Sequence, residues 1–240
     1  DLNEAGGVSA VIKELSKRGL IDTSVMTVTG ETVGKNIENA RILNDDVIHP
    51  IDRPYHEVGG LAILRGNLCP DGAVVKQSAI DPDCWVFEGR ARVFDCEADS
   101  VEAIFAGKIE KGDVIVVRNE GPKGGPGMRE MLTATAAVSG MGAEKDVALI
   151  TDGRFSGAPR GLCVGHVSPA SASGGPIGLL KDGDIIKIDI PGKRMDVKLS
   201  DEELARRRAE WKAPEPRVKE GYLARYARLV SSAAKGAVVE

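Results

Sequence analysis

Two polar residues near the ends of one stretch of the chain could carry chemistry. Glu130 follows a turn, Gly121 to Gly127, that consists of glycine and proline apart from one lysine. Ser156 lies at the tip of a second turn, in the sequence DGRFSGA. A carboxylate can bind a metal ion if further oxygen ligands are present, and a serine hydroxyl exposed at a turn can act as a nucleophile. Each turn follows an apolar segment, and ligands of open α/β layers usually bind beyond the carboxyl ends of strands.

Each of these features also has a purely structural interpretation. The glycine-rich turn could hold an anion with its backbone N–H groups and Lys123 at the start of the next helix, or it could only reverse the chain. The sequence predicts Glu130 in the first turn of that helix, where the helix dipole alone favours a carboxylate. Ser156 does not fit the G-x-S-x-G nucleophile pattern, and serine beside glycine is common in turns. His166, taken alone, is expected to be a half-buried histidine rather than a base.

Apolar segments around these turns predict the elements that would position them. Val114 to Val117 and Val147 to Ile150 read as two buried strands with a helix between them. KGDVI at 111–115 resembles DGDII at 182–186, and both place a Gly-Asp turn before a β-branched strand. This echo suggests a closed, barrel-like sheet. Further strands are expected at 61–64, 73–76, 89–94, 185–190 and 195–199.

Apolar stripes and caps predict the remaining helices and a domain boundary. Residues 97–106 form a helix with Val101, Ile104 and Phe105 on one side, and Ser200 opens a capping box for a helix that ends at Trp211. Residues 44–58 show no period and read as a linker, so we expect domains at 1–55 and 56–240. Other helices are expected at 8–15, 32–41 and 222–234.

Composition excludes several classes of function. Lys and Arg total 32 against 36 for Asp and Glu, a net charge of -4 without a basic patch, which argues against nucleic-acid partners. No apolar run approaches the roughly 20 residues of a membrane-spanning helix, and the start has no signal-peptide order. We expect a cytoplasmic protein, or an organellar one in a eukaryotic host. None of the four cysteines forms a C-x-x-C pair, so neither a metal site nor a disulfide framework is indicated.

Several long motifs in fixed order resemble one family. These are GGLAILRGNLCPDGAVVK, EGPKGGPGMREML, ALITDGRFSGAPRGLCVGHVSP, GGPIGLLKDGDIIKIDIP and the closing YARLVSSAAKGAVVE. Together they are similar to the carboxyl-terminal part of dihydroxy-acid dehydratases, in the family that also holds 6-phosphogluconate and sugar-acid dehydratases. The resemblance covers essentially the whole chain, and the LSDEEL and RRRAEW segments favour the dihydroxy-acid branch.

The resemblance implies a fold, a reaction and two cofactors. The fold would be a swivelling β/β/α barrel-like α/β domain flanked by helices, preceded by a short helical segment from the end of the amino-terminal domain. The reaction would be dehydration of a 2,3-dihydroxy acid to a 2-keto acid in valine and isoleucine synthesis. An iron–sulfur cluster would act on the departing C3 hydroxyl, and Mg²⁺ would hold the carboxylate and C2 hydroxyl of the substrate.

The resemblance also implies roles for individual residues. Glu130 would bind Mg²⁺, and Ser156 would be the base that takes the C2 proton. The backbone at Gly157 and Ala158 would hold the substrate carboxylate, with Arg154 beside it. The chain departs from the family at Ala170, where a glutamate usually follows the HVSP motif.

The ligands of the cluster belong, in this family, to an amino-terminal domain that precedes the matched part. The resemblance therefore implies no cluster ligands in this chain, structural roles for its cysteines, and no activity for this chain alone. Family members are commonly homodimers, so we expect the same here. Two alternatives remain open: a sugar-acid substrate, and a non-catalytic swivelling domain or small subunit that completes a partner's cluster site.

Overall fold

The computed structural model describes residues 1–155 and 160–239. The chain forms two compact units, Asp1–Gly59 and Gly60–Glu240, and each is described by itself. The boundary expected from the sequence, between residues 55 and 56, lies just before the point at which the units separate. Within the described residues, no helix is long and apolar enough to cross a membrane.

Unit 1 is small and contains two helices, α1 (Gly7–Ser16) and α2 (Val33–Asn36). The predicted helix at 32–41 is thus reduced to little more than one turn, which begins where the Thr32 side chain accepts a hydrogen bond from the Lys35 N–H at 3.2 Å. Ala5, Ala10 and Ile48 form its buried apolar cluster. Short helices with so small a core leave most of the unit as turns.

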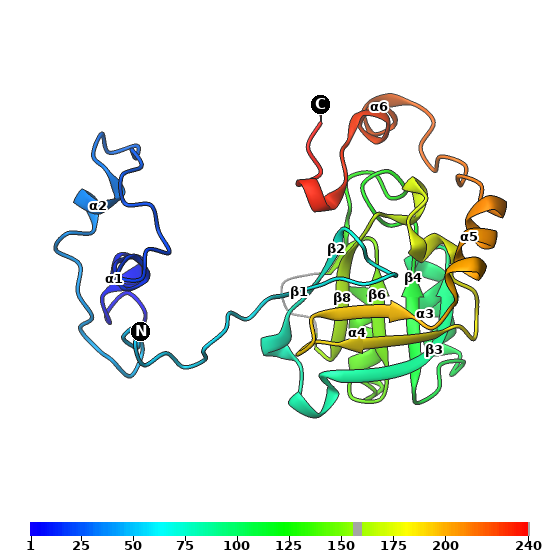
Figure 1. Cartoon of the computed structure of the whole chain (residues 1–240), viewed down its shortest axis with the longest axis horizontal. Helices are drawn as coiled ribbons and strands as arrows, with labels where there is room; N and C mark the ends of the chain where they lie inside the picture. The colour runs from blue at the N-terminus through cyan, green and yellow to red at the C-terminus, as the bar shows by residue number, and fades with distance from the viewer. Residues whose placement is uncertain (156–159, 240) are drawn as a thin grey trace. The chain divides into compact units, whose positions relative to one another are not determined.

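Unit 2 is built on an eight-stranded sheet in the order β1-β2-β8-β6-β4-β3-β9-β10. The two ends of this order meet, because Arg65 after β1 forms a parallel bridge with Arg194 of β10. The sheet therefore curls into a nearly closed barrel, and Figure 1 shows its strands around a common interior. The expected barrel-like α/β fold is confirmed. The strands are β1 (Ala62–Leu64), β2 (Gly72–Val75), β3 (Val86–Phe94), β4 (Asp113–Val117), β6 (Ala148–Thr151), β8 (Leu162–Ser168), β9 (Ile185–Asp189) and β10 (Arg194–Val197).

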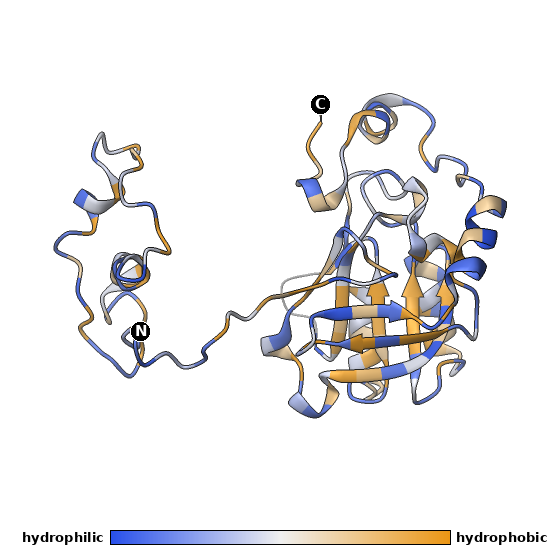
Figure 2. Cartoon of the chain, viewed as in Figure 1, coloured by the Kyte–Doolittle hydropathy of each residue, from blue (hydrophilic) through white to orange (hydrophobic). Residues whose placement is uncertain are grey.

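Two apolar layers share the central strands. β4 and β6 are buried along their whole length, as their uninterrupted apolar sequences predict. Val114 and Val116 point into the barrel, whereas Ile115 and Val117 pack with the helical layer that contains Ala134. Figure 2 shows the apolar colouring continuing along these strands. Strands β3, β4, β6 and β8 are parallel neighbours, so the turns after β4 and β6 leave the sheet at one edge.

Helices cover the outside of the barrel. Helix α3 packs through Ile104, which is 1% exposed, while Phe105 is 70% exposed. The prediction that Phe105 shares the buried face is therefore wrong, because Ala103 occupies that side of the helix. The helices of unit 2 are α3 (Glu97–Phe105), α4 (Thr133–Gly140), α5 (Asp201–Glu210) and α6 (Gly221–Leu229), with single 3₁₀ turns at Gln77–Ala79, Pro82–Cys84, Ser171–Ser173, Pro176–Leu179 and Ala233–Lys235.

The two Gly-Asp turns of the sequence echo have the same local structure. Gly112 and Gly183 have φ angles of 87° and 88°, which favour glycine. Asp113 accepts a hydrogen bond from the Glu110 N–H at 2.9 Å, and Asp184 accepts one from the Lys181 N–H at 2.7 Å. The turns lead into β4 and β9, the two neighbours of β3. The echo thus marks two equivalent entries into the barrel.

The serine half of the predicted capping box opens α5, whereas the Glu203 carboxylate accepts from Arg206 and Arg207. The Ser200 hydroxyl accepts a hydrogen bond from the Glu203 N–H at 3.2 Å. Farther along the helix, Arg207 donates to a carboxylate oxygen of Asp184 at 3.0 Å, and both side chains are largely buried. This ion pair fixes α5 to the turn before β9, and the chain then runs through residues 211–220 to α6.

Candidate functional site

Glu130 lies on a short strand rather than in a helix. β5 (Glu130–Met131) pairs in parallel with β7 (Arg154–Phe155), with Glu130 opposite Arg154. The expected position in the first turn of a helix is wrong, since α4 begins at Thr133. Burial of Met131, at 0% exposure, holds this segment against the helical layer in an extended conformation. Within the described residues, the exposed Glu130 carboxylate has no hydrogen-bond or ion-pair partner.

A different carboxylate caps α4. Glu97, at the start of α3 and 9% exposed, accepts hydrogen bonds from the backbone N–H groups of Thr133 at 3.1 Å and Ala134 at 3.4 Å. Leu132 occupies the N-cap position and has no side-chain oxygen to offer. Glu97 therefore satisfies the helix start and leaves the carboxylate of Glu130 available for another role. The apolar N-cap was the only sign of this arrangement in the sequence.

The glycine-rich turn folds back onto the two residues before it. A Cβ on Gly125 would lie 2.9 Å from Oε2 of Glu120, and one on Gly124 would lie 2.7 Å from the carbonyl oxygen of Asn119. The Gly125 N–H donates to the Gly121 carbonyl at 2.8 Å, inside the turn. Because α4 starts six residues after Gly127, the turn is not at a helix N-terminus, so the arrangement on which the anion-binding alternative depended is not present.

Asp152 ties the ends of the two central strands together. It is fully buried and accepts hydrogen bonds from the N–H groups of Asn119, Glu120 and Ser171, at 3.2, 2.9 and 2.8 Å. Burial raises the pKa of this carboxyl, and the three backbone donors oppose that rise. The segment after β4 and the segment after β6 are therefore held at a fixed separation just before Arg154.

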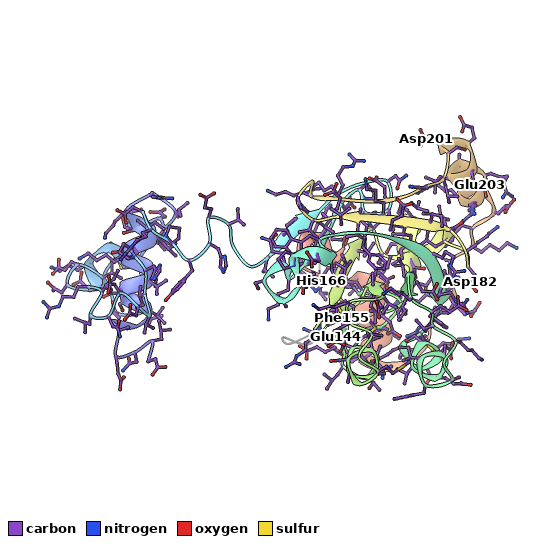
Figure 3. The ribbon with its side chains drawn as sticks, turned by 90° about the horizontal axis from the view of Figure 1, so that it is seen from below. Glu144, Phe155, His166, Asp182, Asp201 and Glu203 are labelled. Atoms are coloured by element: carbon purple, nitrogen blue, oxygen red, sulfur yellow. The ribbon has the colours of Figure 1, made fainter. Side chains whose placement is uncertain are left out.

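Arg154 and His166 line a cavity of about 300 Å³ together with Gly127, Met128 and the tail after α6. Arg154 Nε donates to the Met128 carbonyl, so the arginine also fastens the glycine-rich turn. His166 is half-buried, as expected, and burial followed by the charge of Arg154 lowers its pKa. The backbone N–H of His166 donates to the Gly153 carbonyl at 2.8 Å, which holds β8 beside the segment that leads to Phe155, and Figure 3 labels both residues. Ser156, Gly157 and Ala158 follow Phe155 directly and lie outside the described residues.

The residue that departs from the family pattern, Ala170, is packed beneath this turn. It is 7% exposed, and a Cβ on Gly121 would come within 2.8 Å of its methyl group. Gly121 and Ala170 are therefore in close contact, so a glutamate at position 170 would have to direct its side chain elsewhere.

Because the glycine-rich turn is closely packed, we expect Gly125→Ala to lower the unfolding free energy of the protein. The added methyl group would press against the buried Glu120 carboxylate, and overpacking of this kind costs about 1–3 kcal/mol of unfolding free energy. Gly140→Ala is the matched control: it lies in α4 with nothing within 4 Å of its Cβ position, and we expect about 0.4–1 kcal/mol of stabilisation there. Urea unfolding of the two variants measures the difference, and equal stability would contradict the packing described here.

The described residues do not fit an iron–sulfur cluster. No group of three or more His, Cys, Asp or Glu side chains in residues 1–155 and 160–239 is arranged to hold a metal ion. Cys69 and Cys163 are buried, and burial raises the pKa of each to about 12, which opposes the thiolate form that a cluster ligand needs. For Mg²⁺, Glu130 fits as one accessible carboxylate, and octahedral coordination needs further oxygen ligands.

Comparisons with known proteins agree on one family. The model of the dihydroxy-acid/6-phosphogluconate dehydratase carboxyl-terminal domain matches residues 46–237, and the amino-terminal model of the same family matches residues 1–36. Dihydroxy-acid dehydratases of Acetivibrio thermocellus, Caldanaerobacter subterraneus and Carboxydothermus hydrogenoformans are 60%, 61% and 63% identical over 99–100% of this chain. The chain spans 43% of the length of each of these relatives. It belongs to the dihydroxy-acid/6-phosphogluconate dehydratase family.

Proposed function

We propose that this chain is the carboxyl-terminal part of a dihydroxy-acid dehydratase, a hydro-lyase that converts a 2,3-dihydroxy acid to a 2-keto acid in valine and isoleucine synthesis. The observation that carries the proposal is identity of 60% or more to proteins of that name along the whole chain. The pairing of Glu130 with Arg154 adds support, because it brings the glycine-rich turn and the segment before Ser156 to one edge of the barrel.

The proposed roles of the residues follow from the chemistry of dehydration. Ser156 takes the proton from C2 as the C3 hydroxyl departs, and the resulting enol becomes the 2-keto acid. Arg154 and the backbone of Gly157 and Ala158 hold the substrate carboxylate. Glu130 supplies one oxygen ligand to Mg²⁺. The Mg²⁺ ion and an iron–sulfur cluster would provide the positive charge that lets a serine act as a base.

The remaining ligands would come from residues outside this chain. We place residues 1–55 at the end of the amino-terminal domain, and the match of the amino-terminal family model to residues 1–36 supports this for that part of the segment. This chain alone would then hold no cluster and have no activity. We further propose a homodimer, in which exposed apolar residues of α6 such as Tyr222 and Leu223 are covered, and a cytoplasmic enzyme, or an organellar one in a eukaryotic host.

Turnover by the full-length protein tests the proposal. We expect the anaerobically reconstituted enzyme to convert 2,3-dihydroxyisovalerate to the 2-keto acid and to use a sugar acid such as 6-phosphogluconate much more slowly. Preference for the sugar acid would instead assign the protein to the sugar-acid branch of the family. Failure to dehydrate either substrate, with cluster and Mg²⁺ bound, would contradict the proposal.

A further inference from the structure

Three buried carboxylates form a continuous chain beneath the candidate site: Glu97, Glu120 and Asp152, which are 9%, 2% and 0% exposed. Glu120 and Asp152 each accept a hydrogen bond from the backbone N–H of the carboxylate residue named before it. Glu120 accepts from the Glu97 N–H at 3.1 Å, and Asp152 accepts from the Glu120 N–H at 2.9 Å. Because backbone and carboxylate alternate, a displacement of one segment is passed to the next.

The two ends of this chain lie next to the proposed site residues. At one end, the Glu97 carboxylate holds the first residues of α4, three positions after Glu130. At the other end, Asp152 lies two positions before Arg154 and four before Ser156. Glu120 is in the middle, and the glycine-rich turn is folded over it, since Gly125 and Gly153 both approach its side chain within 3 Å of a Cβ position.

One cation compensates this set of charges among the described residues. Arg217 Nη1 lies 3.0 Å from Glu120 Oε1, and its Nη2 donates to the Asp95 carbonyl at 2.5 Å. Arg217 belongs to the segment 211–220, which runs over the outside of the barrel from α5 to α6 (Figure 1). Glu120 is buried whereas the Arg217 side chain is 36% exposed, so removal of Arg217 would leave a buried carboxylate without its cation, which is costly. The position of Glu120 therefore depends on a residue almost a hundred positions away.

We propose that Arg217 is a positioning residue that fastens segment 211–220 to Glu120 and thereby fixes both Glu130 and residues 152–155, which directly precede Ser156. The guanidinium neutralises Glu120, Glu120 holds the glycine-rich turn and the start of α3, and Asp152 holds the end of β6. In this arrangement segment 211–220, which leads into α6, holds the glycine-rich turn and residues 152–155 in place. The effect on catalysis depends on the proposed function, whereas the effect on backbone order does not.

Arg228 provides a matched control for Arg217. Both arginines line a cavity of about 790 Å³ between segment 211–220, α6 and the glycine-rich turn. Arg228 is exposed and has no ion-pair partner among the described residues. Arg228→Gln removes the same charge from the same cavity without touching the buried carboxylates.

Amide hydrogen exchange of the full-length protein tests the inference without substrate. We expect Arg217→Gln to lose at least about tenfold protection in residues 119–128 and 152–155, because local opening is then less costly. Arg217→Lys should restore most of it, since one ammonium can still reach Glu120, and Arg228→Gln should match the wild type. In active enzyme, kcat of Arg217→Gln should fall by up to about 100-fold, the cost of small misplacements, with KM much less affected.

Glu120→Gln keeps the test decisive if Arg217→Gln does not fold. This variant preserves the shape of the side chain and one acceptor for the Glu97 N–H, but loses the charge, so the same two segments should exchange faster. Combining both substitutions should add little to either one, since they remove the same interaction. Faster exchange confined to residues 211–229, with 119–128 and 152–155 still protected, would overturn the inference. Absence of dehydratase activity in the wild-type enzyme would contradict the proposed function. The hydrogen-exchange result would still decide whether Arg217 has the positioning role.

Discussion

Ser156→Ala in the full-length enzyme is expected to lower kcat by about 10²–10⁴-fold, the contribution of a positioned general base. Alanine removes the only hydroxyl in the sequence DGRFSGA and leaves both of its glycines in place. The iron content, the visible absorption of the cluster and the substrate KM should stay close to their wild-type values, because Ser156 binds neither cofactor in this proposal. Steady-state kinetics together with iron analysis measures both effects.

Ser139→Ala is the control for this substitution. Ser139 lies in α4, and its hydroxyl has no hydrogen-bond partner among the described residues. Alanine favours helix slightly more than serine, so stability and kcat should be unchanged or marginally higher. If Ser156→Ala retains more than about a tenth of wild-type kcat, the loss of kcat is smaller than removal of a general base causes. Ser156 would then not be the base.

Glu130→Gln is expected to weaken Mg²⁺ binding by at least about 100-fold, since loss of outer-shell partners alone costs about 10–100-fold in metal affinity. The amide keeps the size of the side chain but not its charge, and Mg²⁺ prefers charged oxygen ligands. Stability should hardly change, because the Glu130 carboxylate is exposed and Glu97 supplies the cap of α4. Calorimetric titration of the full-length protein with Mg²⁺ measures the change.

Glu102→Gln removes the same charge from the exposed face of α3 and should leave Mg²⁺ affinity unaltered. Unchanged affinity in Glu130→Gln would remove this residue from the metal site. Equal losses in the two variants would mean that general surface charge, rather than coordination, governs the binding.

Local patterns predicted most of the barrel because they depend on neighbours in sequence. The uninterrupted apolar strands β4 and β6, the Gly-Asp turns before β4 and β9, and the Ser200 cap of α5 all formed as expected. Where a pattern allowed two outcomes, tertiary contacts decided. Phe105 fits the apolar side of α3 by spacing, yet that helix packs through Ala103 and Ile104.

The position of Glu130 shows the limit of local reasoning at the site. A carboxylate just before a helical stretch is favoured by the helix dipole, which predicted a cap. Pairing of β5 with β7, 24 residues farther along, drew Glu130 into an extended strand instead. Glu97 then took the place at the helix start, from 36 residues earlier in the sequence.

The sequence by itself determined the family, the strands that feed the two turns, and the residue types that stand there, because these follow from motif order, apolar spacing and turn chemistry. Only the tertiary structure decided that Glu130 lies opposite Arg154 in the β5–β7 strand pair, that Asp152 joins the two strand ends, and that Arg217 reaches Glu120. Those contacts join segments 24 to 97 residues apart. Closure of the barrel brings these segments together, and the spacing of residues along the sequence does not predict it.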